Sequence, residues 1–190
     1  MNDFVKVSPS QFYEAFLTVT SELAPSVKDL WFRNRQFTDL MRSSVFPKIA
    51  EHLGLCCYRR DYYTLDAIFY AETDQKHFPG ATYAKFISVA LEHEHDSSTT
   101  ATEINKLQLF NAPLKVLITY PGNDREAKKL LGDYAEMIEE ADAFEDFATS
   151  RRQLVIFGFL EEVPRWRAFV YSGASFTEIE VPILVAQQGR

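Results

Sequence analysis

Apolar and polar positions repeat with a helical period at the start of the chain and with a strand period further on. A helix is predicted after Ser8 and before Pro25, because apolar side chains recur there every three or four residues. These residues are Phe12, Phe16, Val19 and Leu23. A second helical region begins near Ser26, is interrupted around Pro47 and ends at Gly54, which fits a helix C-cap.

Strands are predicted after this helical region. Three segments rich in aromatic and β-branched residues, at about 55–60, 62–71 and 86–94, have the composition of β-strands. The connection at 72–85 contains Pro79-Gly80 and is expected at the mouth of a site. The remaining pattern predicts a helix at 101–111, a strand at 114–120, an acidic helix at 124–149 and strands at 153–161, 166–172 and 178–185. This order indicates an α/β sandwich around a mixed β-sheet.

Composition limits the number of domains and the location of the protein. A chain of 190 residues, 46% of them hydrophobic, can bury one substantial core, so residues 1–190 are expected to form one domain. Cys56 and Cys57 are adjacent and cannot easily bridge on a strand, which favours a reducing, cytoplasmic location. Neither a signal peptide nor an apolar run long enough for a membrane span is evident, so we expect no membrane association.

The charge of the chain limits how it can bind nucleic acid. A net charge of -7 argues against a protein that coats nucleic acid by electrostatics alone, but it leaves local binding open. Much of the acidic charge lies in the helix predicted at 124–149, whose apolar residues follow a helical spacing. These acidic side chains are therefore interpreted as a solvated helix face.

Two carboxylates stand two residues apart at the end of the strand predicted at 86–94. Side chains alternate between faces along a strand, so Glu92 and Glu94 point the same way and His93 points the other way. Asp66 lies in the neighbouring predicted strand. Clustered carboxylates need a compensating cation, and oxygen ligands suit a hard divalent metal such as Mg2+ or Mn2+. The pattern therefore predicts a metal site at Asp66, Glu92 and Glu94.

The predicted order αβββαβ, with Asp66 on the second strand and Glu92-x-Glu94 on the third, resembles the PD-(D/E)XK, or restriction-endonuclease-like, nuclease superfamily. The resemblance covers about residues 26–121. It leaves an N-terminal helical addition and an αββ extension at about 122–190. It implies that Asp66 and Glu92 bind Mg2+ and that a lysine two residues after the second acid helps to activate water.

This sequence departs from the superfamily pattern at two positions. Glu94 stands where the lysine is usual, and Leu65 stands where proline usually precedes the first acid. The resemblance offers two replacements for the lysine: the Glu94 carboxylate, or Lys106 from the following predicted helix. Lys106 stands three residues after Glu103 on one helix face, so an ordinary surface ion pair is the alternative interpretation.

Two histidines and a helical glutamate near this motif suggest further roles. His93 and His95 flank Glu94 and invite a zinc site, but on a continuing strand both imidazoles face away from that carboxylate. Glu51, in the helical region before the first predicted strand, is either an outer carboxylate of the metal site or a solvent-facing residue.

Taken together, the resemblance implies a metal-dependent nuclease that hydrolyses phosphodiester bonds, with DNA preferred to RNA as the expected substrate. Asp66, Glu92, Glu94 and Lys106 are its expected catalytic residues, Mg2+ or Mn2+ its cofactor, and a homodimer is one option for its assembly. A catalytically inactive protein of the same fold, serving as a binding or assembly module, is the main alternative. An unrelated α/β protein with incidental acids is another, and it requires Asp66 and Glu92 to lie far apart or on opposite faces of the sheet.

Overall fold

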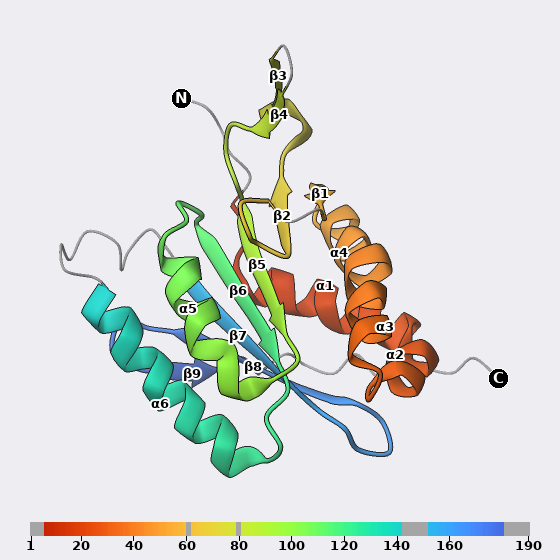
Figure 1. Cartoon of the computed structure of the whole chain (residues 1–190), viewed down its shortest axis with the longest axis vertical. Coiled ribbons are helices and arrows are strands. Elements are labelled where there is room, and N and C mark those ends of the chain that lie inside the picture. Colours follow the sequence, from red (N-terminus) through yellow and green to blue (C-terminus); the bar gives the residue numbers. More distant parts are fainter. Residues whose placement is uncertain (1–5, 60–61, 79–80, 142–151, 181–190) are drawn as a thin grey trace.

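The computed structural model describes residues 6–59, 62–78, 81–141 and 152–180, which form a mixed β-sheet between two layers of helices (Figure 1). The described part of the sheet has the strand order β1-β2-β5-β6-β7-β8-β9. Its strands are β1 (Cys56–Tyr58), β2 (Ala67–Tyr70), β5 (Val89–Glu94), β6 (Leu114–Thr119), β7 (Arg152–Phe159), β8 (Arg165–Tyr171) and β9 (Phe176–Glu178). The coarse prediction of a mixed α/β architecture is therefore confirmed.

Helices cover both faces of the sheet. One layer consists of α1 (Pro9–Glu22), α2 (Ala24–Leu30), α3 (Asn34–Leu40), a π-helix η1 (Met41–Val45) and α4 (Phe46–His52). The other contains α5 (Thr100–Gln108) and α6 (Asp124–Ala141), with the short 3-10 helix η3 (Ser97–Thr99) leading into α5. Figure 1 shows the sheet between the two layers. No helix in the described part of the chain is both long and apolar enough to cross a bilayer.

The chain path explains the pairing of the strands. β1, β2 and β5 follow one another antiparallel, whereas α5 lies between β5 and β6 in sequence and α6 between β6 and β7. The β5–β6 and β6–β7 pairs are parallel, because each helical crossover returns the chain to the same end of the sheet. Alternate strand residues then bury against different layers: Leu91 packs with α1–α4 and Ala90 packs with α5 and α6.

Several local predictions were wrong. The second helical region breaks at residues 31–33, and Pro47 lies in the first turn of α4, where proline does not interrupt the ladder. The strand predicted at 62–71 starts only at Ala67, because residues 62–65 form a tight turn with positive φ at its two central residues. The prediction for Gly54, by contrast, was correct: it follows α4 with a φ of +67°, as a C-cap glycine does.

The other differences lie outside the central strands. Residues 72–85 contain a 3-10 helix, η2 (Glu72–Asp74), and a small hairpin of β3 (Gln75–Phe78) and β4 (Ala81–Ala84), which projects beyond the main sheet (Figure 1). The acidic helix reaches Ala141, and the rest of its predicted range, 142–149, lies outside the described residues. In the described part of the chain the last strand is β9, which begins earlier than the predicted range 178–185, and residues 181–185 of that range lie outside the described part.

Candidate acidic site at the end of the central strand

A pocket of about 500 Å³ lies at the carboxyl end of β5, between the α3–η1 segment and α5. It is lined by Asn34, Arg35, Thr38, Asp39, Arg42, Asp66, Glu92, His93, Glu94, His95, Asp96, Glu103 and Lys106. All four predicted catalytic residues belong to this lining. The described residues of the 72–85 connection do not, so the prediction that this connection forms the mouth of the site was wrong for them.

Strand register brings Asp66 next to Glu92. Ala67 pairs with Leu91 in the antiparallel ladder, so Asp66 and Glu92 stand opposite each other one step beyond that pair. Asp66 Oδ2 accepts a hydrogen bond from the backbone N–H of His93 at 2.7 Å, and Oδ1 accepts one from the Arg42 guanidinium. The two acids therefore share one pocket, which is not the arrangement expected of incidental acids on opposite faces of the sheet.

Lys106 contacts two acids: Glu92 on β5 and Glu103 on its own helix, α5. Its Nζ lies 2.9 Å from Glu92 Oε1, contacts the Glu103 carboxylate and donates to the Thr64 carbonyl at 3.2 Å. The side chain is only 22% exposed. The ion pair with Glu103 is therefore present, and the same ammonium group also reaches Glu92 in the pocket.

Burial governs the protonation of Glu92. The residue is 2% exposed, and this desolvation raises the pKa of its carboxyl to about 9, although the hydrogen bond from Lys106 lowers it. The negative charge of Asp66 raises the pKa further. Burial on its own lowers the pKa of Lys106, but its bonds to Glu103 and Glu92 outweigh that effect and raise it. The surroundings consequently favour the protonated form of both Glu92 and Lys106.

Glu94 and the histidines occupy opposite sides of the end of β5. Glu94 Oε1 accepts a hydrogen bond from the Asp96 backbone N–H at 2.8 Å, while the rings of His93 and His95 both pack against Tyr120. His93 Nε2 lies 2.8 Å from the Tyr120 hydroxyl, and burial lowers the pKa of His93 to about 4. The two imidazoles therefore do not converge with the Glu94 carboxylate on a zinc ion.

A hard divalent cation suits the oxygen donors of this pocket, but the carboxylates are already engaged. Arg42 contacts Asp66, Lys106 contacts Glu92, and Asp96 donates to Glu94. Within the described residues, no group of three or more His, Cys, Asp or Glu side chains is arranged to hold a metal ion. The donor set thus fits Mg2+ or Mn2+ in its chemistry, and binding requires the two cationic side chains to release Asp66 and Glu92.

Arg42 is a charged residue of the pocket that the sequence analysis did not identify. It lies in the π-helix η1 and reaches Asp66 across 24 positions in the chain. Short π-helical segments occur often at functional sites, but no residue pattern in 41–45 announces one. Glu51, in contrast, is exposed on α4 and does not line the pocket, which agrees with its solvent-facing interpretation.

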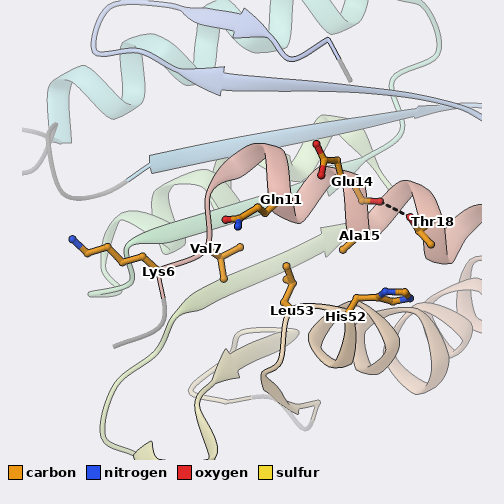
Figure 2. A pocket seen from close by; sticks show the side chains of 8 residues that line it. All are labelled: Lys6, Val7, Gln11, Glu14, Ala15, Thr18, His52 and Leu53. Atoms are coloured by element: carbon orange, nitrogen blue, oxygen red, sulfur yellow. Dashed lines mark hydrogen bonds between the residues drawn. The ribbon is translucent and has the colours of Figure 1, made fainter. Parts of the chain in front are cut away.

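A second hollow of about 380 Å³ lies between α1 and the end of α4 (Figure 2). Its polar groups do not form a comparable cluster. Gln11 completes the capping box of α1 with Ser8, and Thr18 donates to the Glu14 carbonyl within the same helix, as the dashed line in Figure 2 shows. The pocket at the end of β5 is therefore the better candidate for chemistry.

Comparisons of the chain with protein-family models, with curated proteins and with solved structures gave no match.

Proposed function

We propose that this chain adopts a restriction-endonuclease-like fold and acts as a metal-dependent nuclease that hydrolyses phosphodiester bonds of DNA. One observation carries the proposal: Asp66, which directly precedes β2, Glu92 on β5 and Lys106 on α5 meet in one pocket at the end of β5. The chain order supports it, since three antiparallel strands are followed by α5 and a strand parallel to the third. With the small β3–β4 hairpin treated as an insertion between β2 and β5, this order supports the resemblance.

Each residue has a distinct role in this proposal. Asp66 and Glu92 would hold Mg2+ or Mn2+, which supplies a more acidic water and neutralises charge on the scissile phosphate. Lys106, once released from Glu92, points a positive charge into the pocket and orients the attacking water or a phosphate oxygen. Glu94 lies on the same side of β5 as Glu92 and accepts a proton from that water. Arg42 binds the phosphodiester after it leaves Asp66.

A cleavage assay tests this proposal directly. Purified protein with Mn2+ should cut a mixture of single-stranded and duplex DNA, and Asp66→Asn should reduce the rate by at least about a hundredfold. Asp133→Asn is the matched control, because Asp133 pairs with Lys129 on the exposed side of α6. Equal cleavage by wild type and Asp66→Asn would contradict the proposed active site.

The inactive binding module is a second candidate because every carboxylate in the predicted motif has an internal partner. In such a protein Arg42 and Lys106 would be permanent structural partners of the acids. The same assay separates the candidates, since an inactive binding or assembly module would not cut DNA at any Mn2+ concentration.

A further inference from the structure

The turn between β1 and β2 holds two residues in an unusual backbone conformation. Tyr63 and Thr64 have φ values of +49° and +78°, although neither is glycine and Thr64 is β-branched. Hydrogen bonds of 3.1 Å in both directions between Tyr62 and Leu65 close the turn. Strain of this kind persists only where the surroundings fix it, and it is concentrated at functional sites.

The turn is tied to the candidate site. Lys106 donates to the Thr64 carbonyl at 3.2 Å and also contacts Glu92. Leu65 is fully buried, and Asp66 follows it directly into the pocket. The backbone on one side of Tyr63 is therefore fixed relative to the acids, whereas the Tyr63 side chain is 75% exposed.

Tyr63 belongs to a small group of aromatic rings at this edge of the sheet. Its ring centroid lies 5.0 Å from that of Tyr62, which in turn lies 5.6 Å from Tyr58. The rings meet at angles of 85° and 77°, so they contact edge to face and do not stack on one another. Next to Tyr58 in the sequence, the exposed Arg59 donates to the Ser43 carbonyl at 3.0 Å, which holds its guanidinium against η1. The cation tied to the turn itself is Lys106, through the Thr64 carbonyl.

We propose that Tyr63, supported by Tyr62 and Tyr58, is a stacking site for an unpaired base of single-stranded DNA. An exposed aromatic ring on a fixed backbone loses little freedom on binding, and every base has a face that it can stack on. Lys106, which donates to the Thr64 carbonyl of the turn, supplies a positive charge for an adjoining phosphate, and Asp66 follows Thr64 by two residues. The substrate of the proposed nuclease is accordingly single-stranded DNA or a single-stranded tail, an assignment that rests on the proposed function where cleavage is concerned.

The charge of the protein also favours an unpaired strand. With a net charge of -7, the chain gains little from general attraction to the dense phosphate charge of a duplex. Stacking does not depend on that charge and requires bases that are not already stacked within a double helix. Base stacking on Tyr63 beside Lys106 is therefore the mode of binding that suits this surface.

Binding measured without divalent metal tests the stacking site separately from cleavage. Fluorescence anisotropy in EDTA, with a short labelled strand, its duplex and an abasic strand of the same length, should show tight binding only to the strand with bases. Tyr63→Leu should weaken that binding by about five- to 150-fold, whereas Tyr63→Phe should preserve it. Leu109→Ala is the control, because Leu109 is 80% exposed and lies outside the pocket and the turn.

A second measurement does not depend on the variants. A strand containing the fluorescent base analogue aminopurine should be quenched when wild-type protein binds, because the analogue stacks on an aromatic ring. Equal affinity for strand and duplex, absence of quenching, or wild-type affinity in a folded Tyr63→Leu protein would overturn the stacking site. If DNA is not cleaved but these binding results hold, the proposed nuclease activity fails while the stacking site stands.

Discussion

Glu92 combines a buried position with a carboxyl group, and its protonation should affect the stability of the fold. Burial raises its pKa from 4.5 to about 9, so the folded protein holds this proton more tightly than the unfolded chain does. The stabilisation from the bound proton is complete below the unfolded pKa and is lost as the pH rises through the folded value. Stability should thus fall between pH 4.5 and about 9, by up to about 1.4 kcal/mol per pH unit from this group.

Glu92→Gln checks this prediction, because glutamine keeps the shape and cannot titrate. Urea unfolding at a series of pH values should show a shallower decline for Glu92→Gln than for wild type over that range. Glu22→Gln is the control, since Glu22 pairs with Lys48 on the surface and should follow the wild-type curve. Parallel curves for wild type and Glu92→Gln would mean that Glu92 keeps an ordinary pKa.

Individual residues of the site differ in how far the sequence revealed them. The sequence predicted that Glu92 and Glu94 point away from the His93 ring, and this was correct. It could be predicted because side chains on any strand alternate between the two faces of the sheet. Arg42 was missed, since its contact with Asp66 depends on how the helical layer packs at the end of the sheet. No local residue pattern encodes such a contact.

At the scale of elements, α5 brings a cation to the end of β5. If Lys106 replaces the strand lysine, Lys106→Met should lower DNA cleavage by at least about a hundredfold without lowering Mn2+ affinity. Mn2+ affinity is not expected to fall, because the change leaves both acids and removes a competitor for Glu92. Single-turnover cleavage and calorimetric Mn2+ titration measure the two effects.

Lys129→Met is the matched control for this variant. Like Lys106 and Glu103, Lys129 and Asp133 form an ion pair within one helix, but their pair on α6 is exposed and lies outside the pocket. Its loss should change cleavage little and cost less than about 1 kcal/mol of stability. Full activity in Lys106→Met would transfer water activation to Glu94, for which Glu94→Gln is the deciding variant.

Elements with a long apolar pattern were predicted well, and short irregular ones were not. The β5–α5–β6 unit follows from two apolar strands around an amphipathic segment, and the observed bounds differ from the predicted ones by a few residues. The turn at residues 62–65 was included in a strand because Tyr62-Tyr63-Thr64 is rich in strand-forming residues and lacks glycine. Its conformation depends on buried Leu65 and on Lys106, which are contacts between distant parts of the chain.

At the scale of the whole molecule, the pocket joins the two layers of the fold. Arg42 comes from the helical layer that includes α1–α4, and Lys106 comes from α5 in the other layer. Between them, Asp66 directly precedes β2 and Glu92 lies on β5. A metal bound only by this assembled arrangement stabilises the folded protein relative to the unfolded chain. Mn2+ at a hundred times its dissociation constant should therefore add about 2.7 kcal/mol to the free energy of unfolding.

For a chain of 190 residues, that gain should raise the melting temperature by roughly 5–10 °C. Asp66→Asn should abolish the shift and Asp133→Asn should retain it, since only the first removes a ligand. Arg42→Met should enlarge the shift at subsaturating Mn2+, because Asp66 no longer has to leave its guanidinium partner. A melting temperature that Mn2+ leaves unchanged in wild type and in Arg42→Met would exclude a metal site here, and the pocket would then be a network of ion pairs that holds the two layers together.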